Sequence, residues 1–346
     1  MSGARNRILI GDVRDRLADI PANSVDCVIT SPPYFQLRDY GHEGQLGLEM
    51  TVDEWADGLR DVLRDVERVL KQTGVVWVNL GDSYSRHKRH GAPAKSLLLG
   101  PERFSLKLLD DGWIVRNKIV WAKTNPMPSS VRDRLSSTSE VIYLLTRSGS
   151  YFFDLDAIRT PHRSTRSARK DSRPAAQVYP PPGTGAPAWG NHPNTGNHAL
   201  AELNDRGEVG HPLGKNPGDV WETGTASFRG AHFATFPMKL IERPLLATCP
   251  EKVCARCGKP WQREPMRRLG QLAVRGELRQ ACNCDRGWRP GLVLDPFLGS
   301  GTVALAAIAH QRDWLGIELN SDYAAMAEQR IAAASQEAEA RARPAA

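Results

Sequence analysis

Long apolar runs are missing from this sequence of 346 residues. The longest ones, such as 75–80 and 141–145, are far shorter than the ~20 residues that a membrane-spanning helix needs. The N-terminus, MSGARNRILIGD, also lacks the apolar stretch of a secretory signal. These absences predict a cytoplasmic protein that does not associate with membranes.

Cysteine is scarce, because the chain contains only 6 of them, and the few present are clustered. All but Cys27 lie between Cys249 and Cys284. In a reducing compartment such a cluster indicates metal binding rather than disulfide bonds.

Apolar and charged residues are present in ordinary amounts, 40% and 25% of the chain, which excludes general disorder. The length suits two or three domains, or one domain with large insertions. The formal net charge of +7 favours a polyanionic partner, although the excess is modest.

Strand-like and helix-like segments alternate over the first 155 residues. An amphipathic helix is predicted over Thr51–Gln72, opened by a capping box of Thr51 and Glu54. The other predicted elements are strands at 8–13, 25–30, 74–82, 113–121, 140–145, 292–295 and 314–319, and helices at 101–109, 302–310 and from 322 onward. This alternation predicts an α/β protein whose sheet carries helices on both faces.

The α/β pattern is interrupted after Asp154. Residues 157–230 are rich in Pro, Gly, Asn, His and Arg, with almost no apolar periodicity. Within them, Arg159–Arg173 contains six Lys or Arg and one Asp. Such a run is either a solvated loop or part of a surface that follows nucleic-acid phosphates. We therefore expect a first α/β half at 1–156, an insert at 157–229 and a second α/β half at 230–346.

The motif DPFLGSGT, residues 295–302, lies between an apolar strand and an apolar helix. Its glycines, Gly299 and Gly301, allow the backbone to approach a ligand at the carboxyl end of a strand. The motif is not GxGxxG and no Lys follows it, which argues against a dinucleotide or a nucleotide P-loop. Glu318, at the tip of the next strand, is suited to accepting both hydroxyls of a ribose. The combination favours S-adenosylmethionine as cofactor.

The motif TSPPY, residues 30–34, closes the strand at 25–30. Its two prolines make the turn rigid, and they have no N–H groups to compete for nearby carbonyls. A Tyr beside a Ser and rigid carbonyls is suited to holding a flat heterocycle that carries an amino group. Alone the motif could be an ordinary turn, so its value depends on the presence of DPFLGSGT in the same chain.

TSPPY followed by DPFLGSGT resembles the DNA amino-methyltransferases of the permuted β group, in which the catalytic half precedes the cofactor half. The resemblance implies a circularly permuted, Rossmann-like sheet that uses S-adenosylmethionine on double-stranded DNA. It makes 1–156 the catalytic half, 157–229 the target-recognition insert and 230–346 the cofactor half. Segments 120–130 and 230–242 resemble those that line the base pocket and cover the methionine end of the cofactor.

The resemblance also implies roles for individual residues. The predicted catalytic residues are Ser31, Pro32, Pro33 and Tyr34. The predicted cofactor-binding residues are Asp12, Thr30, Phe236, Pro237, Asp295, Pro296, Phe297, Gly299, Ser300, Gly301, Thr302 and Glu318. The order of the halves requires that the strands carrying Asp295 and Glu318 lie beside those carrying Asp12 and Ser31.

The chemistry expected of the turn is transfer of a methyl group to an exocyclic amine. The Ser31 oxygen and the Pro32 carbonyl are suited to accepting the two N–H groups of the amine, and Tyr34 to stacking on a base flipped out of the duplex. In this family Ser at the first position favours cytosine N4 over adenine N6, which remains the alternative. An Asn-Pro-Pro-Tyr motif serves protein glutamine methylation, which the Ser, the order of the halves and the basic insert disfavour.

The cysteines form two tight pairs, Cys254-x-x-Cys257 and Cys282-x-Cys284, within a predicted zinc-ribbon-like insert at 249–288. Four thiolates indicate structural zinc, with Cys249 as a possible substitute ligand and Cys27 as core. An alternative from another class is a zinc-bearing DNA-binding protein with an inactive methyltransferase fold, which the intact motifs disfavour. A cognate restriction endonuclease is a possible partner.

Overall fold

The computed structural model describes residues 5–39, 41–42, 44–162, 211–225, 236–269 and 272–342. The chain divides into two compact units. The first contains Met1–Ile158, Gly218–Glu264 and Glu277–Ala346, and the second contains Arg159–Pro217 and Pro265–Gly276. The first unit carries the large sheet and both sequence motifs.

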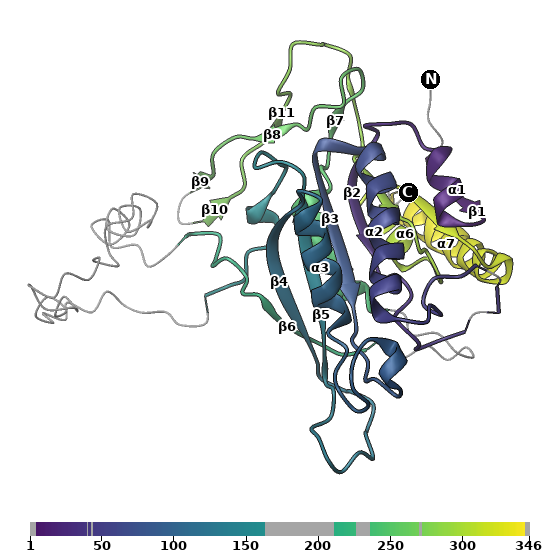
Figure 1. Cartoon of the computed structure of the whole chain (residues 1–346). Helices are drawn as coiled ribbons and strands as arrows, with labels where there is room; N and C mark the ends of the chain where they lie inside the picture. The colour runs from purple at the N-terminus through teal and green to yellow at the C-terminus, as the bar shows by residue number, and fades with distance from the viewer. Residues whose placement is uncertain are drawn as a thin grey trace, which may run out of the picture. The chain divides into compact units, whose positions relative to one another are not determined.

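The first unit is built on an eight-stranded sheet in the order β1-β14-β13-β2-β3-β5-β4-β6 (Figure 1). The strands are β1 (Arg7–Ile10), β2 (Val25–Thr30), β3 (Leu70–Leu80), β4 (Ile114–Lys123), β5 (Ser139–Thr146), β6 (Val220–Thr223), β13 (Leu292–Asp295) and β14 (Asp313–Glu318). Only β5 runs antiparallel to its neighbours in this sheet. Because the other strands are parallel, their carboxyl ends lie along one edge.

Helices cover both faces of the sheet, as the sequence predicts. They are α1 (Val13–Ala18), α2 (Val52–Val69), α3 (Gly100–Asp110), α5 (Met238–Thr248), α6 (Thr302–Ala309) and α7 (Ser321–Ala342), with short 3-10 turns η1 (Lys88–His90) and η2 (Leu155–Ala157). Val28 of β2 joins a core with α1, α2 and α3, whereas Cys27 and Ile29 join a core with α5, α6 and α7. Alternate residues of one strand thus face two helical layers.

Helix α2 shows how local sequence sets an element. The Thr51 hydroxyl accepts the Glu54 N–H at 3.1 Å and the Glu54 carboxylate accepts the Thr51 N–H at 3.0 Å, so the predicted capping box is formed. The predicted helix end at Gln72 is wrong, because the helix ends at Val69 and Leu70 begins β3. Pairing of Leu70 with Val25 in β2 takes the chain out of the helix one turn early.

Strand β6 lies where the sequence analysis expected only insert. It pairs with β4 in parallel, and Trp221 is buried against the core that contains Trp77. Four residues without clear periodicity form this strand because its pairing with β4 supplies the hydrogen bonds. The chain re-enters the first unit at Gly218, whereas the sequence analysis expected the insert to extend to residue 229.

Short pairs of antiparallel strands lie outside the large sheet. In the first unit β7 (Val253–Cys254) pairs with β12 (Trp288–Arg289), and β8 (Gln262–Arg263) pairs with β11 (Leu278–Arg279). In the second unit β9 (Arg267–Leu269) pairs with β10 (Leu272–Val274). Among the described residues, no helix combines the length and apolar character needed to cross a membrane.

Candidate active site

The two sequence motifs meet at the carboxyl edge of the sheet. Strand β13, which ends at Asp295, pairs with β2, which ends at Thr30. Strand β14, which ends at Glu318, pairs with β1, and the Gly11 N–H donates to the Glu318 carbonyl at 2.9 Å. The prediction that these strands from opposite ends of the chain lie side by side is therefore confirmed. Their tips enclose one pocket.

The pocket has both motifs in its wall. Of the predicted site residues, it is lined by Asp12, Ser31, Pro33, Phe236, Pro296, Phe297, Gly299, Ser300, Thr302 and Glu318. Thr30, Pro32, Tyr34, Pro237, Asp295 and Gly301 do not line it. Of the predicted covering segment 230–242, residues 230–235 lie outside the described residues.

Glu318 presents a carboxylate at the tip of β14 that is 9% exposed. Its Oε2 accepts the Gly299 N–H at 2.7 Å and its Oε1 accepts the Asn320 N–H at 2.9 Å. Burial raises the pKa of the carboxyl, and the two backbone donors oppose that rise. Each oxygen keeps a lone pair, so the carboxylate can still accept two hydroxyl groups from a ligand.

The glycine turn is shaped by two left-handed residues, with φ 51° at Gly299 and 83° at Gly301. A Cβ at Gly301 would lie 3.2 Å from the Cβ of Ala327, so this glycine lets α6 and α7 pack closely and does not face the pocket. Ser300 also lines the pocket, and its hydroxyl oxygen is buried without a hydrogen-bond partner among the described residues. Buried hydroxyls normally have a partner.

Asp295, a predicted cofactor-binding residue, is buried beside the pocket and does not line it. It is 1% exposed, and its Oδ1 accepts the Thr30 hydroxyl at 2.8 Å and the Phe297 N–H at 3.1 Å. Burial raises the pKa of this carboxyl to about 7. Asp295 and Thr30 therefore join the tips of β13 and β2 and shape the turn behind the pocket wall.

Asp12 lines the pocket but also caps helix α1. Its Oδ1 accepts the backbone N–H and the side-chain Nε of Arg14, each at 2.8 Å. The Arg14 side chain lowers the pKa of the carboxyl, so Asp12 stays ionised. The charge expected near the cofactor adenine is thus paired with Arg14.

The Ser-Pro-Pro-Tyr turn is held from two sides. The Pro33 carbonyl accepts the Trp55 Nε1–H from α2 at 2.9 Å. The ring of Tyr34 lies against Gly81, where an added Cβ would come within 2.6 Å of its Cε2. The Tyr34 hydroxyl donates to Glu140 at 2.6 Å, and the Ser31 and Tyr34 oxygens lie 3.3 Å apart. The turn is rigid, and Ser31 reaches the pocket from its end.

Several pocket residues were missed by the sequence analysis. Arg38, His42 and Gln45 come from the loop after the Ser-Pro-Pro-Tyr turn, Asn320 directly precedes α7, and Tyr323 lies in its first turn. No motif marks them, because they follow the strand tips at irregular spacing. The sequence feature that could have indicated them is their position a few residues after Ser31 or Glu318.

The four cysteines of the two pairs come together in the first unit. The sulfur atoms of Cys254, Cys257, Cys282 and Cys284 all lie within 4.8 Å of one another. A tetrahedral zinc with Zn–S bonds of ~2.3 Å holds its sulfurs about 3.8 Å apart, so the donor set fits this metal. Cys249 is buried in the core and lies outside the cluster, as does Cys27.

The cysteine cluster lies at the opposite end of the sheet from Ser31. Lys71, near the start of β3, donates from Nζ to the Gly258 carbonyl at 3.2 Å and to buried Asp26 at 2.6 Å. Asn79, near the end of the same strand, contacts Ser31. At ~3.3 Å per residue the two ends are roughly 25 Å apart. The cluster is therefore remote from the pocket.

The comparisons with known proteins agree with this geometry. The N6/N4 methyltransferase family, described as DNA methylase, matches residues 25–329. The type II methyltransferase M.SmaI of Serratia marcescens is 30% identical over 94% of this chain and 90% of its own length. M.XycI of Xanthomonas campestris pv. cyanopsidis is 32% identical over 93% and 86%.

Two solved structures share the fold. The PvuII DNA methyltransferase, titled cytosine-N4-specific, has a TM-score of 0.55 at 18% identity and covers 96% of this chain and 91% of its own. A putative DNA modification methylase from Thermus thermophilus, complexed with S-adenosyl-L-methionine, has a TM-score of 0.51 at 22% identity and covers 95% of each chain. The mixed sheet between helical layers thus has the α/β methyltransferase fold.

The sequence matches show which family of proteins with this methyltransferase fold the chain belongs to. The chain belongs to the N6/N4 DNA methylase family, and it is a DNA methyltransferase.

Proposed function

We propose that the protein transfers a methyl group from S-adenosylmethionine to the N4 amino group of a flipped-out cytosine at specific sites in duplex DNA. The observation that carries the proposal is that Ser31 of the Ser-Pro-Pro-Tyr turn lines the same pocket as Gly299 and Glu318. A cofactor held at the glycine turn therefore faces the group that binds the amine.

The pocket wall offers suitable groups for the cofactor. The Glu318 carboxylate has free lone pairs for the ribose hydroxyls, and Gly299 and Ser300 bring the glycine turn to the pocket wall. Phe236 and Asp12 line the pocket, whereas Pro237 does not. We assign Phe236 and Pro237 to the methionine end of the cofactor and Asp12 to its adenine. The bound cofactor supplies an electrophilic methyl group on sulfur.

The Ser-Pro-Pro-Tyr turn supplies the acceptors for the target amine. The lone pair of an exocyclic amine is delocalised into the ring, so the amine is a weak nucleophile. Hydrogen bonds from its two N–H groups to Ser31 Oγ and the Pro32 carbonyl favour a tetrahedral nitrogen and stabilise its developing positive charge. Trp55 already occupies the Pro33 carbonyl, which leaves Pro32 for this role. Tyr34 is the residue on which the extruded base stacks.

The choice of cytosine N4 over adenine N6 depends on Ser at the first position of the turn and is supported by the cytosine-N4 title of the PvuII neighbour. Duplex DNA treated with the protein and isotopically labelled cofactor is digested to nucleosides and analysed by mass and fragmentation. We expect labelled N4-methyl-2′-deoxycytidine. Labelled N6-methyl-2′-deoxyadenosine would instead show that adenine N6 is the target, and unlabelled DNA would favour an inactive DNA-binding protein.

A structural zinc ion in the first unit belongs to the proposal, with Cys254, Cys257, Cys282 and Cys284 as ligands. A closed set of four thiolates leaves no open position for a substrate, so the metal joins loops and takes no part in methyl transfer. A cognate restriction endonuclease is a proposed partner, since the relatives are named type II methyltransferases.

Target recognition is proposed for the insert. The basic run Arg159–Arg173 extends beyond the described residues after His162. The described part of the second unit contains an antiparallel bridge between Thr160 and Lys215. The proposed recognition region is 157–217, which ends before the sheet resumes at Gly218.

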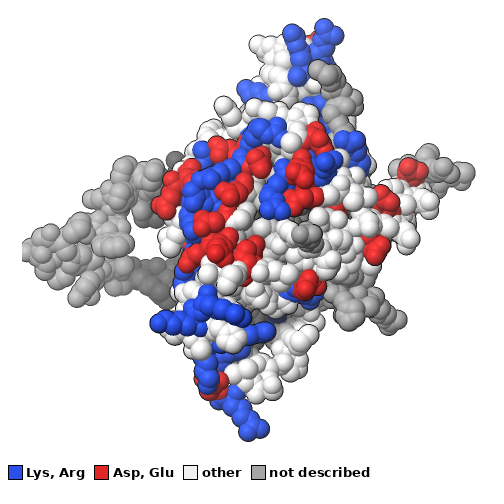
Figure 2. All heavy atoms as spheres, turned by 45° about the vertical axis from the view of Figure 1, so that its right-hand side comes forward, with Lys and Arg blue, Asp and Glu red and all other residues white. Residues whose placement is uncertain are grey.

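A basic surface among the described residues lies at the same sheet edge as Ser31. The loops 83–97 and 124–138, which follow β3 and β4, hold six Lys or Arg and one Asp. An ion pair of 2.8 Å between Lys95 and Asp133 joins the loops, as does Arg134 stacked on Tyr84 at 3.7 Å. Lys and Arg gather on the projecting lower part of the molecule in Figure 2. We call this pair of loops the basic edge.

Neutralising the basic edge by Arg86→Gln, Lys88→Gln, Arg89→Gln and Arg132→Gln is expected to weaken binding to every DNA sequence alike. The slope of log affinity against log salt should fall by up to about 0.9 for each phosphate that the variant no longer neutralises. Sequence preference should persist, because phosphate contacts position the protein and base contacts specify the site. Titrations across a salt series measure both quantities.

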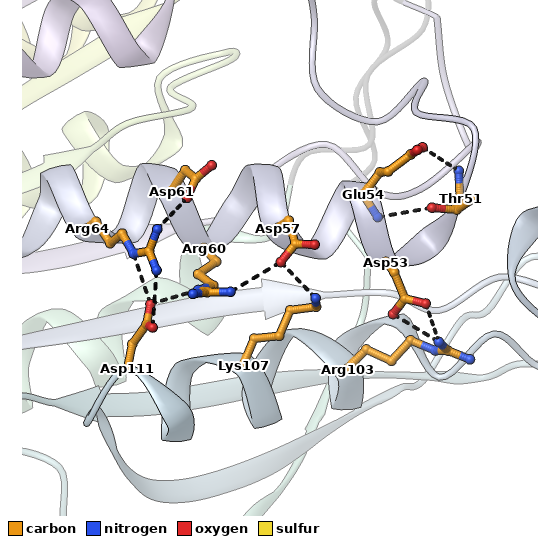
Figure 3. A network of polar contacts seen from close by, with 10 residues as sticks. All are labelled: Thr51, Asp53, Glu54, Asp57, Arg60, Asp61, Arg64, Arg103, Lys107 and Asp111. Atoms are coloured by element: carbon orange, nitrogen blue, oxygen red, sulfur yellow. Dashed lines mark hydrogen bonds and ion pairs between the residues drawn. The ribbon is translucent and has the colours of Figure 1, made fainter.

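The matched control removes four charges from α2 and α3: Arg60, Arg64, Arg103 and Lys107, each changed to Gln. These side chains pair with Asp53, Asp57, Asp61 and Asp111 (Figure 3). Their positive charge is already compensated, so the salt slope should stay near that of the wild type. If the wild type and the basic-edge variant have equal slopes of log affinity against log salt, these loops do not contact DNA phosphates.

A further inference from the structure

Ser31 is one end of a polar cluster that leads out of the pocket. The Ser31 and Tyr34 oxygens lie 3.3 Å apart, and the Tyr34 hydroxyl donates to Glu140 Oε2 at 2.6 Å. Asn79 Nδ2 donates to the same Glu140 oxygen at 2.7 Å, and Lys123 forms an ion pair with the other. We call Ser31, Tyr34, Asn79, Lys123 and Glu140 the relay cluster.

The sheet assembles this cluster from separate strands. Asn79 lies near the end of β3 and Lys123 ends β4, whereas Glu140 lies at the start of β5. Because β5 runs antiparallel to both neighbours, its first residues lie at the edge where β3 and β4 end. Glu140 thereby reaches the turn, although 106 residues separate it from Tyr34.

The direction of the hydrogen bonds follows from what each group can donate. The Glu140 carboxylate, which pairs with Lys123, can only accept hydrogen bonds, so Tyr34 donates its single hydroxyl proton to Glu140. The Tyr34 oxygen is then an acceptor, and it accepts an N–H of Asn79 Nδ2 at 2.6 Å. Either oxygen could donate in the 3.3 Å contact between Ser31 and Tyr34, and with the Tyr34 proton on Glu140 the donor is Ser31. Ser31, which lines the pocket, therefore presents lone pairs to whatever occupies the pocket.

We propose that Glu140 acts through Tyr34 as a positioning residue that makes Ser31 an acceptor, and that it receives the proton released by the target amine. As the bond from nitrogen to the methyl carbon forms, the bond from that carbon to sulfur breaks and nitrogen becomes positive. The amine proton passes to Ser31, the Ser31 proton to Tyr34 and the Tyr34 proton to Glu140. The products are the neutral methylamino base, the thioether and protonated Glu140.

The surroundings of Glu140 suit this role. Its side chain is 13% exposed, so the carboxyl can return the proton to water after each transfer. Lys123, itself 21% exposed and 5.1 Å from the Trp121 ring centroid, forms an ion pair with the carboxylate oxygen that Tyr34 does not use. Asn79, only 6% exposed, holds the carboxylate beside Tyr34. Within the part of the chain that the structure describes, the titratable partners that hydrogen-bond or pair with Glu140 are Lys123 and Tyr34.

Glu140→Gln keeps the shape of the side chain and removes the proton acceptor. We expect the single-turnover rate of methyl transfer to fall about 10²-fold, with KM for DNA, cofactor affinity and melting temperature close to wild type. Glu140→Asp, which keeps a carboxylate, should recover part of the rate. The control Glu102→Gln breaks a Glu–Lys pair with Lys118 on the same sheet and should leave the rate unchanged.

Tyr34→Phe keeps the aromatic ring and breaks the relay at its centre. If Tyr34 and Glu140 act in one chain of proton transfers, the double variant should be no slower than the slower single variant. Additive losses, or a Glu140→Gln rate within about twofold of wild type, would overturn the proposal. The relay rests on the proposed function, and the two can be rejected separately. If Glu140→Gln keeps the wild-type rate of methyl transfer while Ser31→Ala is inactive, only the relay is rejected. If both variants keep the wild-type rate, the turn is rejected as the catalytic site.

Discussion

Ser31→Ala is expected to lower the rate of methyl transfer by about 10²-fold or more while cofactor affinity stays nearly intact. The Ser31 oxygen is the side-chain acceptor of the turn, and its hydrogen-bond contacts are Tyr34 and Asn79 rather than the glycine turn. Single-turnover transfer and calorimetric titration of the cofactor measure the two effects separately.

Ser83→Ala is the matched control for this variant. Ser83 follows β3 at the same edge, and its hydroxyl donates to the Phe35 carbonyl at 3.2 Å without lining the pocket. Removing this hydroxyl should change the rate little. A Ser31→Ala enzyme that keeps more than about a tenth of the wild-type rate would contradict the assignment of this turn as catalytic.

The protein purified without chelators is expected to contain about one zinc ion per chain. Changing Cys254 and Cys257 to Ser should remove the metal and lower the melting temperature, because binding of a structural zinc contributes to folding free energy. Each 1 kcal/mol of destabilisation should lower the melting temperature by roughly 2 °C in a chain of this size. Metal analysis and calorimetry provide the two measurements.

Cys249→Ala is the control for the metal. Cys249 is fully buried in the core, where burial raises the pKa of its thiol well above the ordinary value. Its replacement should destabilise the fold and leave the zinc content unchanged. Because the cluster is remote from Ser31, residual folded protein without zinc should still transfer methyl groups at low temperature. Wild-type protein without zinc would exclude the metal site.

Some of the site was accessible from short stretches of sequence. The apolar strand at 25–30 followed by Ser-Pro-Pro-Tyr, and the strand at 292–295 followed by a glycine turn, each define their local structure through neighbouring residues. The capping box of Thr51 and Glu54 formed as predicted. The spacing of the cysteines likewise indicated a cluster that the structure brings together.

Other features depended on contacts that no short pattern records. The sequence did not indicate that the Asp295 carboxylate accepts the Thr30 hydroxyl and so joins the tips of β13 and β2. Strand β6 was not recognised, because its pairing with β4 rather than its own four residues makes it a strand. Arg38 and His42 reach the pocket from a loop without periodicity.

The sequence by itself determined the elements whose structure depends on adjacent residues: the strands of the large sheet other than β6, the two turns, the capping box of α2 and the cysteine pairs. Only the tertiary structure decided which distant side chains meet, such as Glu140 with Tyr34 and Lys71 with Gly258. The physical reason is that strand pairing and register set these contacts. A shift of one residue in β5 would turn Glu140 to the opposite face of the sheet.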